Sequence, residues 1–294
     1  MRKPNFFVIG APRAGTTSLC TYLADHPLIY FSRVKEPSFF STDYPDLRRA
    51  AQREYENYDD LFAGATDEHL AVGEGSTSYL SSRLAVPKIL EYNPNARFIV
   101  LLRHPADLAF SRHSSNVYHN NDDVEDFEEA WRLQWERACG RHMPPRCEDP
   151  LLVQYSKLYQ LGAQMERLYT HVSSDRVLVH FFEDLANDPL QVYERTLTFL
   201  GVPSNRRMSF PVINQSRRRR SRTADKVLVL LSKLRALAVR RSLGIGSMLE
   251  KANSSPHSFR GLSPEFRSDL IEHFAGDIRQ LSKITGRDLA SWLK

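Results

Sequence analysis

The chain has 294 residues, of which 41% are hydrophobic and 26% charged, and its formal net charge is +5. This composition excludes a disordered or fibrous protein and predicts a single globular domain over residues 1–294. No stretch reaches the roughly 18 uninterrupted apolar residues of a membrane span, and the start of the chain has no room for a signal peptide, so we expect a cytoplasmic protein with reduced cysteines.

The first predicted element is a buried strand over Phe6–Ile9 that ends at Gly10 and leads into a helix. Apolar residues recur at helical spacing from Leu19 to Leu23, and Asp25-His26-Pro27 ends the helix. A tight turn between a strand and a helix aims backbone N–H groups and the positive end of the helix dipole at one point. The turn therefore predicts a site for a phosphate-like anion.

This turn differs from a nucleoside triphosphate loop in its cation. The frame from Gly10 to Gly15 has the Walker spacing, but Thr16 stands where a triphosphatase carries lysine. Arg13, inside the loop, is then the cation of the site, with hydroxyl groups at Thr16 and Thr17 beside it.

The next convincing buried strand, Arg97–Leu102, is followed by Arg103. A Walker-type enzyme usually has an acidic magnesium ligand at such a strand end. Arg103 adds a second anion ligand instead. Arg13 and Arg103 together predict a pocket for a donor with two separated anionic groups and no required metal.

Three segments resemble motifs of the sulfotransferases that use 3′-phosphoadenosine 5′-phosphosulfate (PAPS), and two of them concern the donor. Gly10–Leu19 is similar to the 5′-phosphosulfate loop of that family, and Leu101–Ser111 is similar to its 3′-phosphate motif. In the second motif an arginine and a serine eight positions later, here Arg103 and Ser111, hold the 3′-phosphate. Between them, Lys35–Phe40 resembles the Lys-Glu-x-x-Phe-Phe signature of the heparan-type branch and its bacterial relatives.

The resemblance implies an α/β fold in which helices flank a P-loop-like central parallel sheet. It implies PAPS as donor, 3′-phosphoadenosine 5′-phosphate (PAP) as product, no metal, and an acceptor hydroxyl, most plausibly on a carbohydrate or glycolipid. Glu36 is then the general base, and Arg13 and Lys35 stabilise the charge that develops on the leaving group. The donor-binding residues implied are Arg13, Ala14, Gly15, Thr16, Thr17, Ser18, Arg103 and Ser111.

This chain departs from the family pattern after the third strand. Heparan 3-O-type enzymes carry Glu-Lys-Thr-Pro there, whereas this chain reads Glu74-Gly-Ser-Thr77. The missing lysine bears on a heparan-like acceptor and leaves the donor chemistry intact.

The remaining elements alternate between helices and strands. Helices are expected over Pro105–Tyr118, Val124–Ala138 and Val153–Tyr169, a strand over Arg176–Phe182, and a helix from Asp188-Pro189 to Gly201. This alternation also predicts an α/β protein with a mostly parallel sheet. Ligands of such sheets bind at the carboxyl ends of the strands, where Arg13 and Arg103 are expected.

Positive charge is concentrated in a basic, helical segment over about residues 206–260. It holds fourteen Lys or Arg and two acidic residues, so the rest of the chain is net acidic. Arg217–Arg220 and Arg222 precede Lys226–Arg241, a candidate basic amphipathic helix. The run is either a solvated face, a set of arginines that closes over the donor, or a contact with an anionic acceptor or membrane surface.

Other interpretations stay open for single residues. Arg103 alone is equally consistent with a pair to Asp107, and Lys35 and Glu36 with exposed loop charges. His104 fits a structural role, and we assign it no catalysis. The alternative functions are a nucleotide-dependent phosphotransferase, against which the missing Walker lysine argues, and a non-catalytic anion- or nucleic-acid-binding protein. No aromatic residues interleave the arginine run, which argues against nucleic acid.

Overall fold

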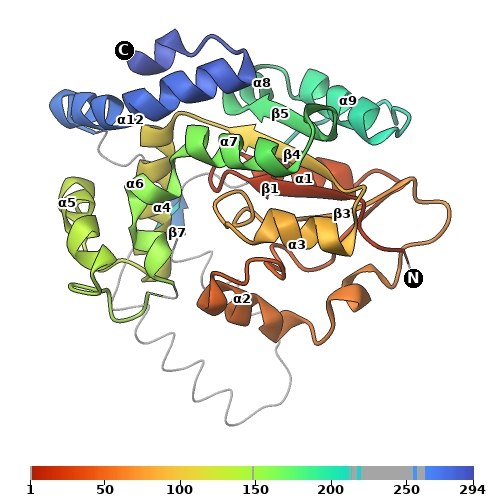
Figure 1. Ribbon diagram of the computed structural model, residues 1–294, viewed down its shortest axis with the longest axis horizontal. Coiled ribbons are helices and arrows are strands. Elements are labelled where there is room, and N and C mark those ends of the chain that lie inside the picture. Colours follow the sequence, from red (N-terminus) through yellow and green to blue (C-terminus); the bar gives the residue numbers. More distant parts are fainter. Residues whose placement is uncertain (1, 148, 212, 214–216, 220–253, 257–261) are drawn as a thin grey trace.

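A five-stranded parallel sheet forms the centre of the molecule (Figure 1). The computed structural model describes residues 2–147, 149–211, 213, 217–219, 254–256 and 262–294. The strand order is β2-β3-β1-β4-β5, so the prediction of an α/β fold with a parallel sheet is confirmed. The strands are β1 (Phe6–Gly10), β2 (Ile29–Phe31), β3 (Ala71–Gly75), β4 (Arg97–Leu102) and β5 (Val177–Phe181).

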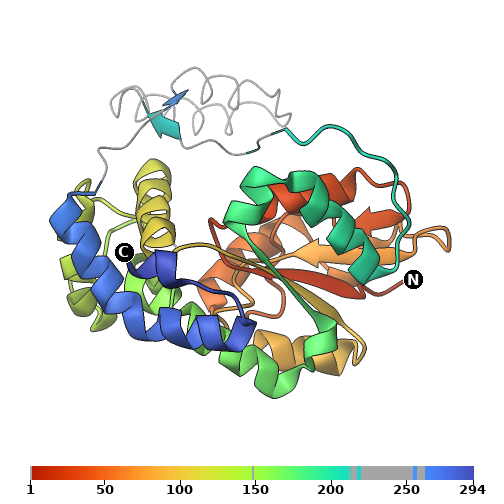
Figure 2. The same cartoon turned by 90° about the horizontal axis from the view of Figure 1, so that it is seen from above.

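Helices cover both faces of this sheet (Figure 2). Helices α1 (Thr16–Ala24) and α9 (Pro189–Leu200) lie over one face, and α3 (Ala85–Tyr92) and α7 (Leu161–His171) lie over the other. The long helix α12 (Pro264–Thr285) packs against α7 and α4 (Pro105–His119). The shorter elements include α2 (Pro45–Ala51), the 3-10 helix η2 (Tyr58–Phe62), α5 (Phe127–Ala138), α6 (Tyr155–Leu158) and α8 (Phe182–Asn187).

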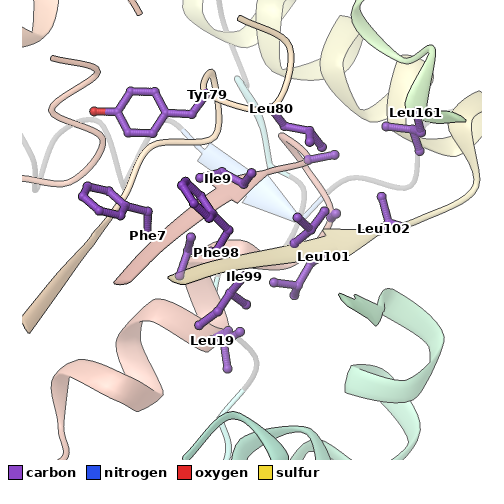
Figure 3. Close-up of a cluster of buried hydrophobic side chains, with 14 of the residues drawn as sticks. Phe7, Ile9, Leu19, Tyr79, Leu80, Phe98, Ile99, Leu101, Leu102 and Leu161 are labelled. Carbon is purple, nitrogen blue, oxygen red and sulfur yellow. The ribbon is translucent and has the colours of Figure 1, made fainter. Parts of the chain in front are cut away.

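The core forms where the two central strands meet the helices that cover them. Every residue of β1 and all but the first of β4 are buried, as expected for parallel strands covered on both faces. Figure 3 shows part of this core, with side chains from both strands, from α1 and α7, and from the segment after β3. The labelled residues are Phe7, Ile9, Leu19, Tyr79, Leu80, Phe98, Ile99, Leu101, Leu102 and Leu161.

Most predicted helices and strands are confirmed, and one helix is wrong. Helix α9 begins after its cap Asp188 and ends at Gly201, which adopts a left-handed φ of 72°. The single helix expected over Val153–Tyr169 is instead divided into α6 and α7. The division places Tyr159 between them, where its buried hydroxyl donates to the carbonyl of Pro12 at 3.4 Å.

The described residues of the basic segment are not helical. Residues 206–211 belong to no helix or strand, and β6 (Arg217–Arg219) pairs antiparallel with β7 (Ser254–Pro256). Strand β6 lies against α4. The helix expected over Lys226–Arg241 lies outside the described residues. In the part of the chain that the structure describes, no helix has both the length and the apolar composition to cross a membrane.

Candidate anion and base site

Residues 11–15 connect β1 to α1 in a tight turn. The amide of Ala11 donates to the carbonyl of Leu101, and the amide of Ala14 donates back to Ala11. Gly15 has a φ of 89°, and a β-carbon there would lie 3.0 Å from a methyl group of Leu185 on α8, so glycine relieves both strain and crowding.

The turn leaves backbone donors at the start of α1. Among the described residues, no acceptor is hydrogen-bonded to the amides of Gly15, Thr16 or Thr17, which open the helix. The amides of Ala14 and Ser18 are already used within the turn, so these residues support the loop. The free amides and the helix dipole suit an anion.

Arg13 and Ser111 lie closer together than the sequence implied. The resemblance assigns them to opposite ends of the donor, but the Arg13 Nε donates to the Ser111 Oγ at 3.1 Å. Arg13 adopts a left-handed φ of 71°, which turns it from the loop toward α4. With Nε on Ser111, the two Nη groups of Arg13 remain as donors.

Arg103 lies at the carboxyl end of β4, as predicted. Its guanidinium packs over the ring of Phe182, 4.4 Å from the centroid. The alternative pair to Asp107 does not form among the described residues, and Asp107 pairs instead with Arg267 at 2.8 Å. The ring of Phe182 also lies beside Gly15, so it contacts both the loop after β1 and the arginine after β4.

Two further groups, Arg112 and Tyr159, belong to the site and were missed from the sequence. The Nε of Arg112 is buried and has no hydrogen-bond partner among the described residues. Burial raises the pKa of Tyr159 to about 12, and the charges of Arg112, Arg13 and Arg103 oppose this rise. Burial also lowers the pKa of Arg13, with Arg112 and Arg103 adding to the effect. The charges of three guanidinium groups therefore act on one buried phenol.

Neither residue carries a usable sequence signal. Arg112 follows Ser111 directly, and adjacent residues of a helix face different directions. Tyr159 reads as one more residue of a helical stripe, since the break between α6 and α7 has no glycine or proline.

Glu36 lies in a turn whose backbone is hydrogen-bonded to the end of β3, the strand beside β1. Its Oε2 accepts a hydrogen bond from Thr77 Oγ1 at 3.1 Å, and its side chain is 36% exposed. The Nζ of Lys35 lies 3.8 Å from Glu36 and is more exposed, at 59%. The negative charge of Glu36 also acts on Arg13. A partly accessible carboxylate thus lies near enough to act on the charge of Arg13.

His104 has a structural role that accounts for both ring nitrogens. Its Nδ1 accepts from the amide of Ala106 and caps α4, so Nε2 carries the proton and donates to the carbonyl of Trp292 at 2.9 Å. Burial lowers the pKa of His104. A neutral ring with both nitrogens occupied is not free to act on a substrate.

The fold and the site together define a parallel α/β protein with free backbone amides at the start of α1 and guanidinium groups after β1 and β4. The chain belongs to the sulfotransferase domain family, whose match covers residues 3–219. The resemblance drawn from the motifs is therefore confirmed.

Three relatives illustrate the match. A crystal structure of a sulfotransferase from Alicyclobacillus acidocaldarius is similar over 100% of both chains, with a TM-score of 0.74 and 26% identity. Carbohydrate sulfotransferase 15 of Homo sapiens is 30% identical over 265 residues, which cover 69% of this chain and 47% of that protein. Bifunctional heparan sulfate N-deacetylase/N-sulfotransferase 3 of Mus musculus is 31% identical over 210 residues, covering 68% of this chain and 22% of that protein. The chain thus spans less than half the length of these two curated relatives.

Proposed function

We propose that this sulfotransferase moves the sulfuryl group of PAPS to an acceptor hydroxyl. The observation that carries the proposal is that Arg13 after β1, Arg103 after β4 and Arg112 on α4 all act on the charge of the buried Tyr159. In the described part of the chain, no carboxylate forms an ion pair with any of the three. Guanidinium groups without an ion-pair partner in a half-buried site favour a ligand with several negative charges.

The two ends of the donor fit different parts of this cluster. The free amides of residues 15–17 and the Nη groups of Arg13 suit the 5′-phosphosulfate. Arg103, Ser111 and Arg112 suit the 3′-phosphate, because α4 and the end of β4 carry all three. Since the chain itself supplies the positive charge, we expect the donor to bind without added metal.

Glu36 is the proposed general base. Its carboxylate takes the proton from the acceptor hydroxyl as that oxygen forms its bond to sulfur. The bond between sulfur and the 5′-phosphate oxygen breaks, and the electron pair leaves on the phosphate to give PAP. Arg13, the loop amides and Lys35 stabilise the charge that develops on this leaving group.

A carbohydrate or glycolipid is the proposed acceptor class. The names of carbohydrate sulfotransferase 15 and the heparan sulfate relative support a carbohydrate. The segment Glu74–Thr77 lacks the lysine of the heparan 3-O type, so a heparan chain is not required.

The test is transfer of labelled sulfuryl from PAPS to a panel of glycans, glycolipids and phenols. Glu36→Gln should lower kcat by about a hundred- to ten-thousand-fold, because the hydroxyl keeps its proton. Affinity for PAP, measured by calorimetry without metal, should stay unchanged. Glu68→Gln, at an exposed loop carboxylate far from the arginines in sequence, is the control and should keep normal turnover. A normal rate in Glu36→Gln would remove Glu36 as the base.

A further inference from the structure

Glu74, at the end of β3, is a fully buried carboxylate held by hydroxyl groups. Tyr58 and Tyr79 donate to its Oε1 at 3.0 and 2.7 Å, and Ser76 donates to its Oε2 at 2.7 Å. No lysine or arginine of the described residues forms an ion pair with it. A buried carboxylate without a cation is costly, which calls for a reason beyond packing.

The hydrogen bonds of Glu74 continue into the turn that carries Glu36. Ser76 Oγ, while donating to Glu74, accepts the amide of Ser38 at 2.9 Å. Glu36 and Ser38 both adopt left-handed conformations, with φ of 53° and 51°. Such conformations cost of order 1–3 kcal/mol each for non-glycine residues and persist only where surrounding contacts fix them.

Two more contacts hold the same turn on β3 and its surroundings. The amide of Glu36 donates to the carbonyl of Gly75 at 3.1 Å, and the Tyr55 hydroxyl donates to the carbonyl of Pro37 at 2.9 Å. Both of these use backbone acceptors whose strength does not change with pH. The Ser76 link is different, because its geometry depends on a titratable group.

We propose that Glu74 is a positioning residue for the Glu36 base: its ionised carboxylate orients Ser76, which fixes the strained turn through the Ser38 amide. The inference rests on the proposed function of Glu36. Three hydroxyl hydrogens point at this one group, and the ionised carboxylate accepts all three without holding a hydrogen of its own. Protonation of Glu74 at Oε2 adds a fourth hydrogen where the Ser76 hydroxyl hydrogen points, so the Ser76 hydroxyl must turn and the strained turn loosens.

The surroundings of Glu74 set the pH at which this occurs. Burial raises the pKa of Glu74 to about 7; the hydrogen bonds from Ser76, Tyr79 and Tyr58 oppose the rise, and the charge of Glu36 adds to it. Tyr55 and, from α1, Cys20 also face this charge; burial raises the pKa of each, and Glu74 adds to the rise. The ionisable groups around Glu74 are Cys20, Glu36, Tyr55, Tyr58 and Tyr79, with Lys35 beside Glu36 and Arg48 near Tyr55.

The experiment compares pH profiles of kcat for the wild type, Glu74→Gln and Tyr58→Phe. Wild-type kcat should fall as the pH drops through about 7. Glu74→Gln should lower kcat by roughly tenfold to a hundredfold and abolish this acid limb, since a misplaced base costs up to about that much. Tyr58→Phe should move the limb to higher pH, because Tyr58 donates to Glu74 and not to the turn. PAP affinity should be unchanged in both variants.

Hydrogen exchange of the Ser38 amide gives a readout that does not depend on turnover. Exchange should be faster in Glu74→Gln and in Ser76→Ala than in the wild type. An unchanged acid limb in Glu74→Gln, or unchanged Ser38 exchange in Ser76→Ala, would overturn the positioning role. If the wild type transfers no sulfuryl group, the proposed function fails, and the exchange data still decide whether Glu74 orders the turn. Should Glu74→Gln fail to fold, Tyr58→Phe and Ser76→Ala retain the test.

Discussion

Two regions of the molecule treat buried arginine in opposite ways. Arg137 on α5 is fully buried, and its two Nη groups donate to the two carboxylate oxygens of Asp122 at 2.8 Å each. The hydroxyl of Tyr155 donates a further hydrogen bond to the Asp122 carboxylate at 2.6 Å. Around Tyr159, by contrast, the charges of three guanidinium groups act on one phenol, and no carboxylate of the described residues forms an ion pair with them. The first region contains its own counter-charge, whereas in the second the ligand that we propose would supply it.

Removing Arg137 should produce the largest loss of stability. Arg137→Met leaves Asp122 buried without a cation, which costs about 3–5 kcal/mol of unfolding free energy. Arg132→Met, on the same helix, breaks only the exposed pair with Glu128 and should cost at most about 0.5 kcal/mol. Urea unfolding of both variants measures the difference. Equal losses of unfolding free energy in the two variants would show that the buried Arg137–Asp122 pair is not a special support of the fold.

The second buried carboxylate, Glu74, lacks a cation and should therefore respond to pH. Its pKa is raised from 4.5 to about 7 in the folded chain, so between these values the unfolded chain has released the proton and the folded chain retains it. The stability that Glu74 contributes is therefore fully present below pH 4.5 and is lost as the pH rises through about 7. Relative to Glu74→Gln, which does not titrate, the wild type should lose about 3 kcal/mol across this window.

Urea unfolding of both proteins on either side of that window measures the effect. Other carboxyl groups titrate in both proteins and cancel in the comparison. A stability difference that is independent of pH would mean that Glu74 is ionised at its ordinary pKa, and that its hydroxyl partners suffice to replace a cation.

Removing Arg103 should weaken donor binding more than it weakens the fold. Arg103→Ala should reduce PAP affinity by about 10- to 150-fold, the equivalent of about 1.5–3 kcal/mol for a charge-assisted hydrogen bond. Its contact with Phe182 contributes only about 0.5–1 kcal/mol to stability. Arg97→Ala is a matched control, because Arg97 begins the same strand and lies over Phe199 at 5.8 Å. Calorimetry that finds equal PAP affinity in both variants would exclude Arg103 from the site.

The predictable parts of this site are those encoded in local sequence. The apolar runs of β1 and β4 can be recognised in the sequence because parallel strands are buried on both faces. The residues that follow the two strands lie at the same edge of the sheet. Arg13 and Arg103 could therefore be placed together from two strand ends. The assignments of their ligands rest on the resemblance and stay predictions.

The remaining parts depend on contacts between distant segments. The bond between Arg13 and Ser111 joins residues 98 positions apart, and it required both the left-handed loop residue and the placement of α4. Glu74 reads as an ordinary strand end, since its partner Tyr58 comes from η2 and has no fixed spacing to it. No periodicity reveals such pairs, because each is set by tertiary packing.

Replacing Arg112 should give the smallest change in stability and in affinity. It also tests most directly the difference between Arg137, which has a carboxylate partner, and the arginines near Tyr159, which have none in the described chain. Its Nε is buried and unpaired within the described chain, and its charge acts against that of Arg13. Arg112→Gln should thus raise the unfolding free energy by about 1 kcal/mol, because it removes a repulsion and an unsatisfied donor. The same variant should weaken PAP binding by roughly fivefold to tenfold.

Urea unfolding and calorimetry on this one variant separate the two roles of an arginine. A residue that holds the fold loses stability when it is replaced, as Arg137 should, whereas a residue kept for an external anion gains stability and loses affinity. If Arg112→Gln loses both, Arg112 is part of the scaffold, and the anion site reduces to Arg13 and Arg103. If it gains stability and loses affinity, the unpaired charge is maintained for the ligand at the expense of the fold.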